Sequence, residues 1–249
     1  MKWFPCPIFQ VMLVLFAAVS THAGGAENGQ KGEGTGRYLV REMRGWTLRL
    51  NPRLLESEPK PTARALELLQ VQLDEIVRVV PEAAVVRLKA VPLYFNPEYP
   101  GVQPRAEYHP DGGWLKENGR DPSMAKGVEF TNIRIFEAET NRMPNFALHE
   151  LAHAFHDREV RMGFANPEIR DAYRRAKDSG TYEKVERWYG NGKPNSFERA
   201  YAMTTPQEYF AETSEAYFSK NDFFPFVKTE LKQHEPAMFG LLAKLWGVR

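Results

Sequence analysis

The chain has 249 residues, of which 43% are hydrophobic and 26% are charged. This length and composition are typical of a globular protein, and they exclude a wholly disordered chain, a collagen and a polytopic membrane protein. Lysine and arginine number 33 against 32 aspartates and glutamates, so no excess charge favours a nucleic acid or an anionic membrane as partner. The single cysteine, Cys6, excludes a disulfide framework and a thiolate metal site.

The first 23 residues have the pattern of a secretory signal peptide. Lys2 gives a positive start, and residues 8–19 form an apolar run that only Gln10 interrupts. Thr21 and Ala23 supply the small side chains for cleavage after position 23. The run is shorter than the roughly 20 residues that span a bilayer, although an uncleaved anchor is the alternative. We therefore expect a secreted or periplasmic protein with no membrane segment after cleavage.

A glycine-rich stretch follows the signal peptide. Residues 24–36 include six glycines and predict a flexible linker, because such a composition cannot build a packed core. From there to the C-terminus we find no repeat, no second linker and no abrupt change of composition. One domain is expected over residues 37–249.

The first part of this domain is predicted to be rich in strands. Trp46–Leu50 alternates apolar and polar residues, residues 84–95 are rich in β-branched side chains, and residues 127–136 alternate over their whole length. Residues 62–80 carry leucines at helical spacing and predict one long helix. Residues 96–123 hold five prolines and are expected to form turns.

The chain after Pro144 is predicted to be mostly helical. Five helices are expected: residues 145–161, 167–177, 181–188, 206–217 and 234–246. Strands followed by helices favour an α+β fold. We expect a small mixed sheet with an N-terminal helix, a central helix after Pro144 and a helical C-terminal lobe.

The strongest chemical signal is the segment His149-Glu150-Leu151-Ala152-His153, which has the pattern H-E-x-x-H. Residues i and i+4 share one helix face, so His149 and His153 can bind one zinc ion. Glu150, beside the first ligand, could take a proton from a metal-bound water. A chance occurrence with two ordinary core histidines is the alternative. His156 lies two turns from His149, too far for the same ion, and is expected at the surface or beside a ligand.

A catalytic zinc ion needs a third protein ligand. The metzincin pattern requires a glycine at position 156 and a histidine at position 159, where this chain has His156 and Glu159. A carboxylate from a later helix is the other solution, and Glu208 and Glu212 share a face there. Glu208 is the expected ligand, and Glu212 would accept a hydrogen bond from a ligand histidine.

Thr205 leaves an alternative open for this pair. Thr205 and Glu208 also have the spacing of a capping box, and Pro206 suits the first position of a helix. If Glu208 served only as a cap, Glu212 would be the ligand.

At these residues the sequence resembles the lethal-factor-like metallopeptidases, which are gluzincins with a zincin-like fold. Three features match in order: His149-Glu150-x-x-His153, then Tyr201 seven residues before Glu208, then Glu208-Tyr209-Phe210-Ala211-Glu212. The resemblance spans residues 149–212. It implies that His149, His153 and Glu208 bind one Zn²⁺ ion and that Glu150 is the general base. It also implies that Tyr201 stabilises the transition state and that Glu212 supports a ligand.

The expected function is that of an exported zinc endopeptidase whose partners are peptide or protein substrates. In such enzymes the peptide usually lies extended beside an edge strand, and residues 127–136 are the candidate here, although an interior strand is equally compatible. The alternative function is a zinc-binding module of the same fold that binds peptides or proteins without cleaving them.

Overall fold

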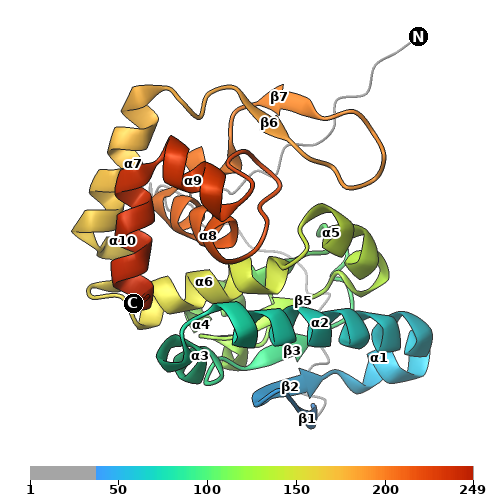
Figure 1. Cartoon of the computed structure of the whole chain (residues 1–249). Coiled ribbons are helices and arrows are strands. Elements are labelled where there is room, and N and C mark those ends of the chain that lie inside the picture. Colours follow the sequence, from blue (N-terminus) through green and yellow to red (C-terminus); the bar gives the residue numbers. More distant parts are fainter. Residues whose placement is uncertain (1–37, 249) are drawn as a thin grey trace, which may run out of the picture. The chain divides into compact units, whose positions relative to one another are not determined.

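A computed structural model describes residues 38–248 of the chain (Figure 1). The predicted signal peptide and the whole of the predicted linker lie outside these residues and stay predictions. The described chain forms a mixed five-stranded sheet packed against helices, so the predicted α+β class is confirmed. Among the helices of residues 38–248, none combines the length and the apolar character needed to cross a bilayer.

The main sheet has the strand order β1-β2-β3-β5-β4. In that order the strands are β1 (Leu39–Met43), β2 (Trp46–Leu50), β3 (Leu93–Phe95), β5 (Val128–Phe130) and β4 (Ala106–Tyr108). The two outer pairs are antiparallel and the two inner pairs are parallel. Since β4 has a neighbour on one side only, it forms an edge of the sheet. A separate hairpin joins β6 (Val185–Arg187) to β7 (Ser196–Glu198).

Helices cover one face of the sheet and build the C-terminal lobe (Figure 1). The α-helices are α1 (Pro52–Ser57), α2 (Pro59–Val79), α3 (Glu82–Leu88), α4 (Gly112–Glu117), α5 (Phe136–Arg142), α6 (Phe146–Arg158), α7 (Pro167–Ser179), α8 (Pro206–Phe218), α9 (Lys228–His234) and α10 (Pro236–Trp246). Single 3-10 turns are η1 (Pro122–Met124), η2 (Ile133–Ile135), η3 (Gly163–Ala165) and η4 (Tyr201–Met203).

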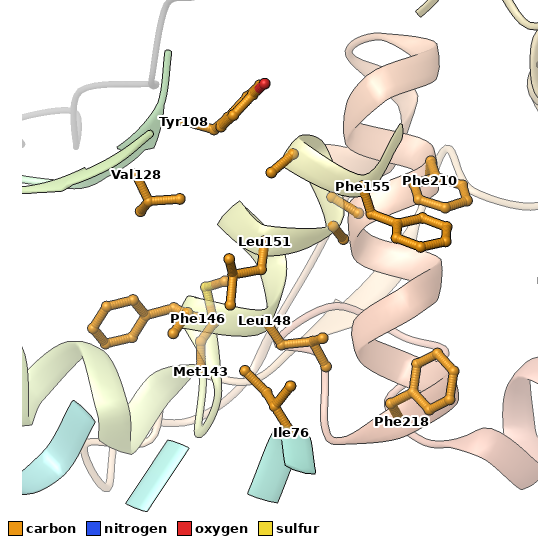
Figure 2. Close-up of a cluster of buried hydrophobic side chains, with 14 of the residues drawn as sticks. Ile76, Tyr108, Val128, Met143, Phe146, Leu148, Leu151, Phe155, Phe210 and Phe218 are labelled. Atoms are coloured by element: carbon orange, nitrogen blue, oxygen red, sulfur yellow. The ribbon is translucent and has the colours of Figure 1, made fainter. Parts of the chain in front are cut away.

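Helix α6 is the centre of the core. Its side chains are buried nearly all round, as expected for a helix with apolar residues on every face. Figure 2 shows it between Val128 of the sheet and Phe210 and Phe218 of α8. Phe155 of α6 also stacks on Trp246 of α10, with ring centroids 4.0 Å apart. Burial of a phenylalanine side chain stabilises the fold by about 1.5–3 kcal/mol, so these contacts help to fix the position of α6.

The start of α6 is fixed by polar groups from α2. Asn145 caps the helix by accepting the backbone N–H of Leu148 at 3.0 Å, and its amide nitrogen donates to the carbonyl of Gln72. The side chain of Gln72 in turn accepts the backbone N–H of Ala147 at 2.9 Å. Two N–H groups that a helix start leaves without partners are thereby satisfied inside the core. The fold therefore sets both the position and the register of α6.

Three predicted elements are wrong. Residues 84–95 are not a continuous strand, because α3 occupies their first part and only β3 pairs in the sheet. The strand predicted over residues 127–136 is limited to β5, and the chain then enters a 3-10 turn and α5. Residues 181–188 form a turn and β6 instead of a helix. The strand at Trp46–Leu50 and the other predicted helices are present; the last one is α10, and α9 precedes it as a helix that the sequence did not predict.

Candidate metal centre

The three expected metal ligands converge on one point between α6 and α8. His149 and His153 lie on one face of α6 with their Nε2 atoms 3.1 Å apart. The Oε2 atom of Glu208, in the first turn of α8, lies 3.1 Å from Nε2 of His149 and 3.3 Å from Nε2 of His153. The three ligand atoms thus form a nearly equilateral triangle, and all three residues are largely buried.

This triangle has the size that a metal ion requires. Ligand atoms about 2.0–2.1 Å from a tetrahedral zinc ion lie roughly 3.3–3.4 Å from one another. The separations of 3.1 to 3.3 Å in the protein agree with that value. Two imidazoles and one carboxylate are also a donor set of catalytic zinc sites, which leaves one position for water or substrate.

The charges around the triangle favour a cation there. Burial alone would lower the pKa of His149, but the carboxylates of Glu215 and Glu208 outweigh burial and hold that pKa well above its usual value. Burial would likewise raise the pKa of Glu208, but the two histidines hold it far below the usual range. A divalent ion that binds the unprotonated imidazoles satisfies the same carboxylates.

The start of α8 places Glu208. Thr205 caps this helix and accepts the backbone N–H of Glu208 at 3.2 Å, while Pro206 occupies the first turn. The side chain of Glu208 does not complete a capping box but faces the two histidines. The spacing of Thr205 and Glu208 had left open that Glu208 serves only as a cap. In the structure Thr205 caps α8 and thereby orients Glu208 towards the candidate ligand position.

The residue that supports His149 is not the expected Glu212 but Glu215. Nδ1 of His149 lies 2.8 Å from Oε2 of Glu215, whereas the nearest oxygen of Glu212 is 3.8 Å away. Glu212 instead accepts a hydrogen bond from Asn221 at 3.0 Å. The expected hydrogen bond between a ligand histidine and Glu212 is thus replaced by one to Glu215. Glu215 is completely buried and stands three residues further along α8.

Glu150 is held by the edge strand of the sheet. Its Oε2 atom accepts the backbone N–H of Tyr108, in β4, at 2.8 Å. The side chain of Tyr108 strengthens the same junction, because its hydroxyl donates to Asp157 of α6 at 2.6 Å. Glu150 therefore lies between the three candidate ligands and β4. No sequence signal pointed to Tyr108, since β4 lies in the stretch that was predicted to form turns.

Tyr201 approaches the site from the turn η4. Burial and the neighbouring carboxylates of Glu208 and Glu212 raise the pKa of its phenol, and a hydrogen bond to Glu208 acts in the same direction. The phenol consequently stays protonated at neutral pH and can donate a hydrogen bond. The structure thus brings together all six predicted site residues, but the hydrogen-bond partner of Nδ1 of His149 is Glu215 and not Glu212.

His156 is buried, and the expectation of a surface position is wrong. Its ring packs on Phe164 and Phe210, with centroids 5.1 and 4.8 Å away. Neither ring nitrogen makes a hydrogen bond of normal geometry within the described residues. Burial and the nearby His153 lower the pKa of His156 to about 3. The fold therefore holds this imidazole in its neutral form.

We expect His156→Leu to make the protein less sensitive to acid. An unfolded histidine has a pKa of about 6.5, so the folded protein disfavours proton uptake by His156 as the pH falls towards 3. Above pH 6.5 His156 is neutral in both states and its protonation does not affect the free energy of unfolding. Below pH 6.5 the unfolded state gains a proton that the folded state cannot take up, so His156 lowers the free energy of unfolding by about 1.4 kcal/mol per pH unit. Urea unfolding of the metal-free variant and wild type at pH 7.5 and pH 5 checks this. A stability difference that does not change with pH would contradict the assignment.

Two comparisons with known proteins find similar proteins. Residues 131–246, which hold every predicted site residue, match the model of a family described as glucose-regulated metallo-peptidase M90. The structure is similar to that of the Pro-Pro endopeptidase PPEP-2 from Paenibacillus alvei, with a TM-score of 0.43 and 18% sequence identity. That similarity covers 74% of this chain and 90% of the other. No curated protein sequence matches the chain.

The family match classes the protein as a metallopeptidase, a hydrolase that acts on peptide bonds. Peptides or proteins are accordingly its class of substrate. The triangle formed by His149, His153 and Glu208 is the place where this class of enzyme needs a metal ion.

Proposed function

We propose that the protein is an exported zinc endopeptidase related to the lethal-factor-like enzymes. His149, His153 and Glu208 would hold one zinc ion, with Glu150 as general base and Tyr201 as oxyanion donor. The observation that carries the proposal is the triangle of ligand atoms, whose sides of 3.1 to 3.3 Å suit a tetrahedral zinc ion. When bound there, zinc lowers the pKa of water towards about 7 and polarises the peptide carbonyl.

Glu150 moves the proton in this mechanism. One carboxylate oxygen is fixed by the Tyr108 backbone N–H, which orients the group and leaves the other oxygen to accept a proton from water. The same carboxyl group then delivers the proton to the leaving amine as the peptide bond breaks. Because β4 holds the carboxylate, Glu150 needs no reorientation between the two proton transfers.

Tyr201 would act on the carbonyl oxygen of the substrate. Negative charge grows on that oxygen as water attacks, and a phenol that remains protonated can donate a hydrogen bond to it. Tyr201 is also close enough to interact with Glu208, so its hydroxyl lies beside a metal ligand. This placement suits a donor that strengthens as the reaction proceeds.

The substrate is proposed to lie along β4. The expectation that residues 127–136 provide the edge is wrong, because β5 lies between β3 and β4. In β4, Glu107 is paired with Glu129 of β5. The backbone N–H and C=O groups of Ala106 and Tyr108, on either side of Glu107, therefore point outward from the edge of the sheet. An extended peptide could pair with the backbone groups of Ala106 and with the carbonyl of Tyr108 while its scissile bond reaches the metal centre, because the N–H of Tyr108 already donates to Glu150.

Export is the remaining part of the proposal, and it is supported by the sequence of the first 23 residues. We expect the exported protein to begin at Gly24, because Thr21 and Ala23 suit a signal peptidase. Intact-mass analysis of the protein collected outside the cytoplasm checks this. A chain that begins at Met1 and fractionates with membranes would instead identify an uncleaved anchor.

Digestion of a broad peptide library by the zinc-loaded protein tests the proposed activity. We expect internal cleavage of peptides, with products identified by mass spectrometry. A zinc-bound protein that cleaves nothing in the library would favour the non-catalytic binding module.

A further inference from the structure

A buried ionic cluster lies on the face of the sheet away from α6. Glu107 of β4 and Glu129 of β5 stand directly opposite each other across the strand pair. Two like charges in such a position repel and destabilise the pairing. Burial alone would raise the pKa of Glu129, but hydrogen bonds from His109 and Tyr99 hold it below the usual value. Glu129 is therefore ionised although it is almost completely buried.

Arg120 supplies the opposing charge. Its Nη1 atom lies 2.6 Å from Glu107 and 3.3 Å from Glu129, and its side chain is only 7% exposed. The guanidinium is also fixed between the rings of Tyr99 and Trp114, with centroids 4.8 and 4.9 Å away. The carboxylates and His109 could in principle hold a metal ion, but the cation that they surround is this arginine.

The cluster connects to the metal centre through the backbone of β4. Glu107 precedes Tyr108, whose N–H holds the carboxylate of Glu150 at 2.8 Å. The strand has three residues and a single neighbour, β5, and one backbone hydrogen bond on each side continues the pairing: Thr131 N–H donates to the carbonyl of Arg105 at 2.9 Å, and His109 N–H donates to the carbonyl of Gly127 at 3.0 Å. If Glu107 and Glu129 repelled each other without a counter-charge, the middle of this pairing would loosen and the N–H of Tyr108 would move away from Glu150.

We propose that Arg120 is a positioning residue for peptide hydrolysis: it neutralises Glu107 and Glu129 and so holds β4 where it orients Glu150. This inference rests on the proposed role of Glu150. A lysine could not replace the arginine fully, because a guanidinium is planar and stacks between two rings while it binds carboxylates.

Hydrogen exchange of the β4 amides in the zinc-loaded protein tests the proposal independently of catalysis. Arg120→Met keeps an apolar stem of similar length and removes the charge, so we expect the Tyr108 amide to exchange at least about tenfold faster. The double variant Arg120→Met/Glu107→Gln removes the repulsion as well, and exchange should return towards the wild-type rate. Arg134→Met is the matched control, because Arg134 makes a two-point ion pair with Glu58 at the surface.

The kcat/KM for a peptide that the wild type cleaves should follow the same order. We expect a loss of about tenfold or more in Arg120→Met, recovery in the double variant and no change in the control, with equal zinc content throughout. If the wild type cleaves nothing, the proposed activity fails while the exchange experiment still decides the role of Arg120.

Wild-type exchange in Arg120→Met would overturn the proposal. So would a double variant that exchanges as fast as Arg120→Met, because Arg120 would then act through packing and not through charge. Should Arg120→Met fail to fold, the double variant is compared with Glu107→Gln. The proposal requires both of these to fold with protected β4 amides, and an unfolded double variant would contradict it.

Discussion

Glu150→Gln is expected to abolish peptide cleavage while the protein keeps its fold and its metal ion. Glutamine has nearly the same shape as glutamate, and its carbonyl oxygen can still accept the N–H of Tyr108. An amide cannot take up a proton at neutral pH, so neither the attacking water nor the leaving amine is assisted. Loss of general acid–base catalysis costs about 10²–10⁴-fold in rate, and here one group serves two steps.

The measurement is kcat/KM on a peptide from the library digest, together with zinc content and thermal unfolding. Glu159→Gln is the control, because this residue ends the same helix and pairs with Arg87 away from the metal centre. Tyr201→Phe should have a smaller effect than Glu150→Gln, since losing one oxyanion donor costs on the order of 10²–10³-fold. Near wild-type activity in Glu150→Gln would place the base elsewhere.

Removal of the Glu208 carboxylate is expected to lower zinc affinity far more than removal of the carboxylate of Glu212 or Glu215. Glu208 supplies one of the three ligand atoms, so Glu208→Ala should lose the ion as His149→Ala and His153→Ala do. Glu215→Ala should weaken zinc binding by about 10–100-fold, because Glu215 only orients His149 and increases its basicity. Glu212→Ala should have a smaller effect, because its oxygen is 3.8 Å from the same imidazole.

Competition with a chromophoric chelator gives these affinities for the folded variants. Glu215→Gln is the conservative control, because its amide oxygen can still accept the hydrogen bond from His149, and it should bind zinc more tightly than Glu215→Ala. Equal and small losses in all three alanine variants would show that Glu208 serves only to start α8. A larger loss for Glu212→Ala than for Glu208→Ala would move the ligand by one turn of the helix.

The parts of the site that the sequence predicted are those fixed within one helix. His149 and His153 share a face of α6 whatever surrounds them, and Thr205 with Pro206 sets where α8 begins. Glu212 and Glu215 differ by only about 60° around α8, at 3.6 residues per turn. Which of them meets His149 depends on how α8 is rotated against α6, and no local pattern specifies that rotation.

The errors in the fold have the same origin. Ala84, Val85 and Leu88 are buried at helical spacing, but their β-branched neighbours made this stretch resemble a strand. Strand β4 has only the three residues Ala106-Glu107-Tyr108, so its alternation is too short to distinguish a strand from a turn before its pairing with β5 is known. The identity of the edge strand, and with it the partner of Glu150, could therefore come only from the tertiary structure.

Titration of the metal-free protein with zinc, monitored by cleavage of a library peptide, shows whether the protein is a zinc endopeptidase. We expect no cleavage without metal, an increase in rate in proportion to added zinc, and saturation at one equivalent per chain, because His149, His153 and Glu208 form one site. Cleavage that persists in the metal-free protein, or a fully zinc-loaded protein that cleaves no peptide, would contradict the proposed function.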